Sequence, residues 1–79
     1  MLYGRKIDKL IGEMEQVFDV VHRKDSVSII IEAGRAVHIH RFVSACDGKL
    51  IVNVNMGGRT VKYKTQEELT RKILDFVIG

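Results

Sequence analysis

Two glycine-containing dipeptides divide the middle of the chain into short apolar runs and limit how this region can fold. Asp47-Gly48 and Gly57-Gly58 both suit two-residue hairpin loops, whose central positions need positive φ. The first loop sets Val43 opposite Val52, and the second sets Val52 opposite Tyr63. Both registers place the same residues of the shared strand on one apolar face. Since a one-residue slip would reverse every side chain, this agreement predicts two consecutive hairpins.

A third turn, around Glu32-Ala33-Gly34, extends the hairpins to a meander. A three-residue loop with Gly34 in the left-handed conformation sets Ile29 opposite Val37 and Val27 opposite Ile39, whereas a two-residue loop gives the wrong parity. The expected strands are Val27–Ile31, Arg35–Cys46, Lys49–Asn55 and Arg59–Lys64.

Helical patterns flank these strands on both sides. Apolar residues recur at helical spacing from Gly4 to Arg23, although the run Val17–Val21 has strand-like composition and leaves an earlier helix end open. After the strands, Thr65 and Glu68 form a capping box that starts a second helix. The sheet offers the surface that both apolar stripes need. We therefore predict one α+β domain over residues 1–79: a two-layer, four-stranded antiparallel meander with both helices packed on one face, in the order α-β-β-β-β-α.

Several classes of protein do not fit this sequence. It has no apolar run long enough to span a bilayer and no charged-then-apolar leader, and its single cysteine, Cys46, fits a reducing cytoplasm. His38 and His40 alternate on one strand, but a zinc site needs at least a third ligand. No cofactor motif or catalytic constellation is recognisable. We expect a cytoplasmic protein that is not an enzyme and holds no metal or cofactor.

The distribution of charge draws attention to the second face of the sheet. Residues 33–64 contain six basic residues and one acidic residue, whereas the segments on either side are slightly acidic. An open, basic sheet face with an aromatic ring, amides and histidines is typical of surfaces that bind single-stranded nucleic acid. The residues expected to contact nucleic acid are Arg35, His38, His40, Phe42, Asn53, Asn55, Arg59, Lys62 and Lys64.

A protein-interaction module is the alternative function. The first expected strand has no charge before Glu32, and an unguarded apolar edge can accept a strand from a second copy or from a foreign peptide. An apolar patch on the open face would serve the same purpose. This hypothesis predicts a homodimer, or an inhibitor of viral, phage or plasmid origin, with interface residues Val27, Ile30 and Ile51.

One residue conflicts with the predicted faces. Arg41 falls on the apolar parity, between Ile39 and Val43 and opposite Val54. Either its aliphatic stem lies over the rim of the core with the guanidinium in water, or a bulge re-aims the strand near it.

Overall fold

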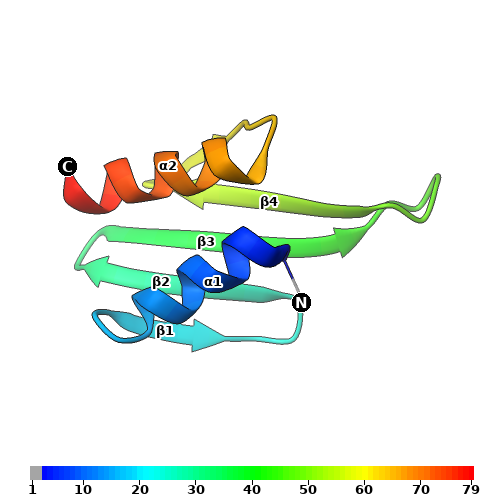
Figure 1. Ribbon diagram of the computed structural model, residues 1–79. Coiled ribbons are helices and arrows are strands. Elements are labelled where there is room, and N and C mark those ends of the chain that lie inside the picture. Colours follow the sequence, from blue (N-terminus) through cyan, green and yellow to red (C-terminus); the bar gives the residue numbers. More distant parts are fainter. Residues whose placement is uncertain (1–2) are drawn as a thin grey trace.

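The computed structural model describes residues 3–79 and contains one antiparallel sheet and two helices (Figure 1). Neither helix in this range is long and apolar enough to cross a membrane. The five strands follow one another as a meander, in the order β1-β2-β3-β4-β5. The α+β class is confirmed, with five strands in place of the expected four. The elements are α1 (Arg5–Met14), β1 (Asp19–His22), β2 (Ser26–Glu32), β3 (Arg35–Val43), β4 (Leu50–Met56), β5 (Arg59–Val61) and α2 (Gln66–Ile78).

The additional strand replaces the second half of the expected first helix. The expected helix from Gly4 to Arg23 is confirmed only as far as Met14, where α1 ends and the chain turns into β1. The earlier helix end, which the strand-like run Val17–Val21 had left open, is therefore the correct alternative. Val20 of β1 lies opposite Ile29 of β2 and packs against the core. The β-branched residues of this segment fit a half-buried strand better than a helix. As a result, β2 is an inner strand of the sheet and has no free edge.

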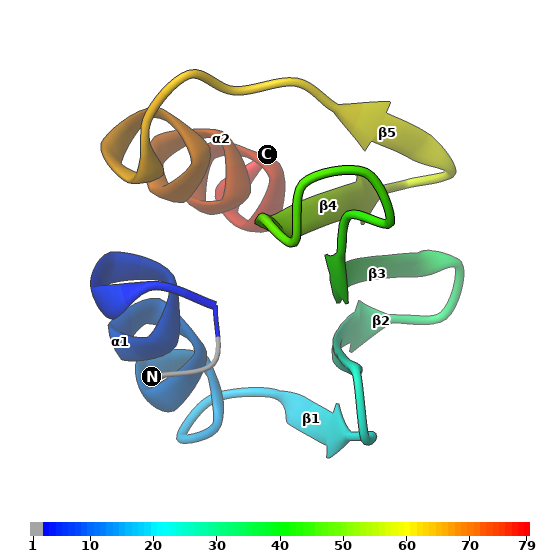
Figure 2. The same ribbon diagram turned by 90° about the vertical axis from the view of Figure 1, so that its right-hand side faces the viewer.

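The core lies between the helices and one face of the sheet. Figure 2 shows α1 and α2 on the same side of the strands. Alternate residues of β2, β3 and β4 point toward the helices, which matches the period of two in a strand, and those at the centre of the sheet have no exposed surface. The fully buried side chains come from all these elements: Ile7, Val27, Ile29, Val37, Ile39, Val54, Leu69 and Ile73.

Two of the three predicted registers are confirmed. Ile29 faces Val37 with Gly34 at φ +80°, and Val54 faces Val61 across the Gly57-Gly58 turn. The β3–β4 register is wrong by two residues, because Val43 faces Leu50.

Hydrogen bonds inside the β3–β4 turn explain this shift. The Gly48 N–H donates to the Ser44 carbonyl at 3.0 Å, and the Lys49 N–H donates to Asp47 Oδ1 at 2.9 Å. These bonds close a six-residue turn in place of a two-residue loop. An even shift keeps every side chain on its predicted face.

The last strand is shorter than predicted, because β5 ends at Val61. Lys62 and Lys64 therefore lie in the connection to α2 and not on the sheet. The capping box is confirmed: Thr65 Oγ1 accepts the Glu68 N–H at 3.1 Å, and Glu68 Oε2 accepts the Lys64 N–H at 2.9 Å. The second bond, aided by Lys72, lowers the pKa of the Glu68 carboxyl.

Arg41 causes no bulge. The β3–β4 register is continuous through it, with Arg41 opposite Val52, so the bulge alternative is wrong. Its backbone N–H donates to the Asp25 carbonyl at 2.8 Å, and its guanidinium lies 3.7 Å from the Asp25 carboxylate. The side chain is thus held at the rim of the core by the β1–β2 turn.

The alternation of β2 can be tested with two neighbouring residues. Ile29→Ala should lower the free energy of unfolding by about 2–5 kcal/mol, because it leaves a cavity in the core. Ile30→Ala, at a position 41% exposed on the other face, should cost about 1 kcal/mol or less. Urea unfolding followed by circular dichroism measures both. Equal losses would contradict the assignment of the two faces.

Candidate functional site

The face of the sheet away from the helices, here called the outer face, is the first candidate surface. Its residues alternate with those of the core, and each strand contributes to it. The outer face consists of Asp19, Val21, Arg23, Ser26, Ser28, Ile30, Ala36, His38, His40, Phe42, Ile51, Asn53, Asn55 and Thr60.

Uncharged polar side chains form two rows across the centre of the outer face. Ser28, His38 and Asn55 lie opposite one another on β2, β3 and β4. Ser26, His40 and Asn53 form the next row in the same way. Hydroxyl, imidazole and amide groups both donate and accept hydrogen bonds. The centre of the face is therefore suited to hydrogen bonding without net charge.

Apolar pairs flank these two rows on either side, along the direction of the strands. Phe42 lies directly opposite Ile51 beyond the row of His40, and Ile30 lies opposite Ala36 beyond the row of His38. Phe42 and Ile30 are both exposed. The outer face thus has two separate apolar patches rather than one.

A hydrogen-bond network orients His38. Arg23 Nη1 donates to Ser28 Oγ at 2.7 Å, and Ser28 Oγ lies 2.8 Å from His38 Nδ1. Because a guanidinium only donates, Ser28 Oγ accepts from Arg23. If the Ser28 hydroxyl gives its own proton to His38 Nδ1, the neutral imidazole carries its proton on Nε2 and presents a hydrogen-bond donor on the other side of the ring.

Asn55 is oriented by a neighbouring turn. Its Oδ1 accepts the N–H of Gly58 at 3.1 Å, so the amide oxygen is occupied by the β4–β5 turn. The NH₂ group donates to no acceptor within residues 3–79, so its two N–H bonds are available to a ligand. Asn55 lies directly opposite His38 on the neighbouring strand.

The contact between Ser28 and His38 superficially resembles a nucleophile and its base. Ser28 is only 3% exposed, and its Oγ is engaged by the Arg23 guanidinium. A nucleophilic serine needs an accessible oxygen and a base held by a third group. This pair orients the histidine and is not arranged for attack on a substrate.

All four cations predicted to contact nucleic acid lie away from the outer face. Arg35 points to the helix layer, where its guanidinium bonds Glu32 and the Phe76 carbonyl and lies 5.1 Å from the centroid of the Phe76 ring. Arg59 lies opposite the buried Met56, on the inner parity. Lys62 and Lys64 are outside the sheet. Arg23 and Asp19 are the charged residues of the outer face, and their charges cancel.

The predicted interface residues also separate. Val27 is fully buried and pairs with His22 on one side and Ile39 on the other, so the expected free edge at this strand does not exist. Ile30 and Ile51 do lie on the outer face, at opposite ends.

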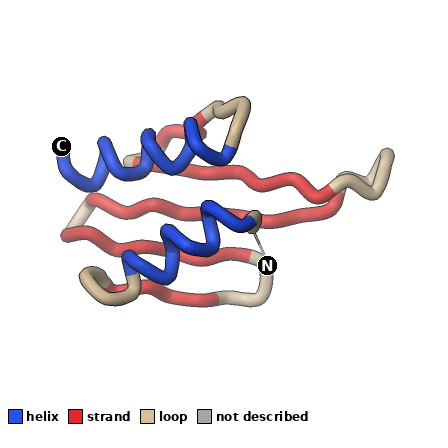
Figure 3. The backbone as a smooth tube through the Cα atoms, in the orientation of Figure 1, coloured by secondary structure: helices blue, strands red, loops and turns tan. Residues whose placement is uncertain are grey.

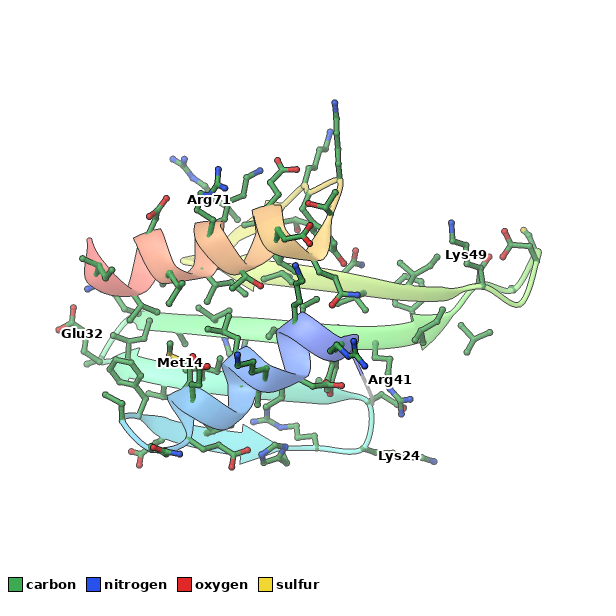
Figure 4. All side chains as sticks on the ribbon, viewed as in Figure 1. Met14, Lys24, Glu32, Arg41, Lys49 and Arg71 are labelled. Atoms are coloured by element: carbon green, nitrogen blue, oxygen red, sulfur yellow. The ribbon has the colours of Figure 1, made fainter. Side chains whose placement is uncertain are left out.

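The β3–β4 hairpin supplies a second candidate surface. β2 pairs with β3 only as far as His40, and β5 pairs with β4 only from Val54 onward, so residues 41–52 continue as a two-stranded projection. Figure 3 shows this projection, here called the arm, extending past the other strands. In Figure 4, Arg41 lies at its base and Lys49 at its far end.

The arm carries apolar side chains on both of its faces. Phe42 and Ile51 face each other on one side, and Val43 and Leu50 on the other. Val43 is 64% exposed and Leu50 is 46% exposed. A hollow of about 300 Å³ at the base is lined by Asp25, Arg41, Phe42, Val43 and Leu50.

Sequence reasoning missed two features of these surfaces. It placed Arg23 at the end of a helix, although the alternation of Asp19, Val21 and Arg23 with core-facing neighbours is the signal of a strand. It also placed the turn of the arm too late in the chain, which hid the pairing of Phe42 with Ile51.

Comparison with protein-family models, with curated proteins and with solved structures gave no match. Within residues 3–79, no three histidine, cysteine or carboxylate side chains gather in a way that could hold a metal ion.

The orientation of His38 is testable by NMR. In the wild-type protein, long-range ¹H–¹⁵N spectra should show neutral His38 with its proton on Nε2. Ser28→Ala removes the group that fixes this tautomer, so a mixture should appear, with a loss of about 0.5–1.5 kcal/mol in the free energy of unfolding. Ser26→Ala, in the next row, should leave His38 unchanged. A wild-type His38 protonated on Nδ1 would contradict the prediction that the Ser28 hydroxyl is the donor in this contact.

Proposed function

We propose that the protein acts by binding another protein molecule, and that its working form is a homodimer assembled through the arm. The observation that carries this proposal is the exposure of apolar side chains on opposite faces of one hairpin: Phe42, beside the half-buried Ile51, on one face, and Val43 and Leu50 on the other. Contiguous exposed apolar surface on a small protein is typical of interaction sites.

The arm has no core of its own. An isolated two-stranded ribbon is marginally stable in water, because its apolar side chains have nothing to pack against. The end of the β3–β4 hairpin extends past the other strands and the helices (Figures 1 and 3). A second protein surface placed over the arm would remove these side chains from water and stabilise the hairpin.

Charge favours a second copy as the occupant. The turn of the arm carries Asp47 and Lys49, and its base carries Asp25 and Arg41. If two arms lie antiparallel about a two-fold axis, the turn of each copy meets the base of the other. Each contact between opposite charges then occurs twice, once on each side of the two-fold axis, as in any symmetric dimer interface.

The hollow at the base provides a seat for the partner. It is bounded by the charged pair Asp25 and Arg41 and by the apolar side chains of the arm. Its volume of about 300 Å³ is large enough for an apolar side chain from a second copy. We expect the exposed Leu50 side chain of the second copy to fill this hollow.

Nucleic-acid binding is the second candidate. It is favoured by the net charge of +3 and by the presence of Phe42, His40, Asn53 and Asn55 on one face. Phe42 would stack on a base and the amides would contact base edges. Because the outer face has no net charge, this binding would rest on stacking and hydrogen bonds more than on phosphate contacts.

The homodimer can be tested by sedimentation equilibrium over a wide range of concentration. The wild-type protein should show twice the mass of the chain. Leu50→Glu introduces a charge into the interface and should raise the dimer dissociation constant at least about tenfold, which corresponds to about 1.4 kcal/mol. Val17→Glu is the matched control, because Val17 is 71% exposed at the turn after α1 and far from the arm in the fold. A wild-type monomer at every concentration, or equal effects of the two substitutions, would refute the proposal.

Nucleic-acid binding can be tested by fluorescence anisotropy with single- and double-stranded oligonucleotides at two salt concentrations. Single strands should be preferred, and the logarithm of affinity should fall by only about 0.7 per logarithm of salt for each phosphate contact. Phe42→Ala should cost about 1–3 kcal/mol of binding free energy through lost stacking. The double change Lys62→Glu and Lys64→Glu should have a smaller effect. Absence of binding at low salt would remove this candidate.

A further inference from the structure

We propose that the two copies of the dimer join through the free edge of β4, so that their sheets continue into one another along residues 50–53. This inference rests on the proposed homodimer and specifies the backbone groups that hold its two arms together. Two observations carry it: the length of β5, which leaves part of β4 uncovered, and hydrogen bonds that fix the direction of the peptide groups of β4.

β5 covers only part of its neighbour. Its last residue, Val61, lies opposite Val54, whereas β4 already begins at Leu50. Residues 50–53 therefore have a strand partner on the β3 side alone. This uncovered stretch of the edge, here called the notch, lies directly beside the arm.

The ladder between β3 and β4 shows which residues direct their backbone groups into the notch. The Ser44 N–H donates to the Lys49 carbonyl at 2.8 Å, and at the other end of β4 the Gly57 N–H donates to a carbonyl of β3 at 3.4 Å. In an antiparallel pair, residues that bond the partner alternate with residues that face away from it. Both bonds assign the odd-numbered residues of β4 to β3, so Leu50 and Val52 direct their N–H and C=O groups into the notch.

Tyr63 gives independent support for this direction. Its hydroxyl, which follows β5 in the chain, donates to the Val52 carbonyl at 3.0 Å. A carbonyl oxygen has two lone pairs, so this group can accept a second bond. The Val52 N–H and both backbone groups of Leu50 bond nothing within residues 3–79. The notch therefore presents unpaired donors and acceptors to an incoming strand.

A second copy of β4 matches this edge when it runs antiparallel with Ile51 on the two-fold axis. Leu50 of each copy then lies opposite Val52 of the other, and each such pair exchanges both of its N–H···O bonds. On the outer face, the apolar pair of Phe42 and Ile51 continues into the same pair of the second copy. On the other face, Leu50 of the second copy joins the row of Val52 and Arg41, beside the hollow at the base of the arm.

The position of the notch favours a second copy over an unrelated strand. Because the notch lies beside the arm, each arm enters the notch of the other copy, and both notches are filled at once. The incoming turn ends near the carboxyl end of β5, where Lys62 and Lys64 are exposed and form no ion pair within residues 3–79. Asp47 of that turn supplies the opposite charge, while Lys49 lies opposite the neutral Asn53.

Amide exchange followed by NMR of the full chain tests the pairing. Sedimentation first establishes the concentrations at which dimer and monomer predominate. In the dimer, exchange at Leu50 and Val52 should be at least about tenfold slower than in the monomer, because both N–H groups become bonded. Thr60 is the control: it alternates with Arg59 and Val61, which face β4, so its N–H also points away from the sheet but lies outside the notch. Its exchange should not change.

The outcomes separate this inference from the proposed function. A dimer in which Leu50 and Val52 exchange as fast as in the monomer would overturn the strand pairing and leave the dimer intact. A monomer at every concentration would refute both.

A change of one backbone group separates strand pairing from side-chain packing. Cys46 allows the chain to be assembled by ligation of two synthetic peptides, so an ester can replace the N–H of Leu50 and keep its side chain. Loss of this donor from both copies should raise the dimer dissociation constant at least about fivefold. The same ester at Thr60 should change it by less than about twofold. Circular dichroism verifies that both proteins are folded, and equal effects of the two esters would overturn the inference.

Discussion

The strict alternation of side chains along β3 is the constraint on which the rest of this structure depends. Val37 and Ile39 point into the core and exclude water completely, so His38 and His40 must point to the opposite face. Each neighbouring strand is aligned to β3 directly or through one other strand, and its own residues take their faces from that alignment. The core and the candidate binding surface are therefore two consequences of one register.

The turns could be predicted from the sequence wherever backbone geometry alone determines them. Gly34 and the Gly57-Gly58 pair adopt positive φ, and the hairpins around them have the predicted registers. The prediction failed where hydrogen bonds from side chains determine the length of the turn. The bonds of Ser44 and Asp47 create a longer turn than the Asp47-Gly48 signal indicates. β1, with only four residues, is too short for its period to be separated from that of a helix.

The candidate site shows the same division. Alternation correctly placed His38, Phe42, Asn53 and Asn55 on one face, since parity survives an even error in register. Charge counting along the sequence could not place Arg35, because its position depends on the carboxyl end of α2 and on the Phe76 ring, which lie 41 residues away. The charge of a surface depends on contacts between residues that are distant in the sequence. The face of the sheet on which a residue lies depends only on the local alternation of the strand.

The meander also separates two kinds of folding event. Every strand pairs with its neighbour in sequence, so the sheet can grow one hairpin at a time. The two helices, by contrast, meet across almost the whole chain: the Lys6 N–H donates to Gln66 Oε1, 60 residues away. Bringing them together closes a long loop, and this entropic cost is offset only once the sheet has formed. We therefore expect docking of α1 beside α2 to come late in folding, and its loss to come first in unfolding.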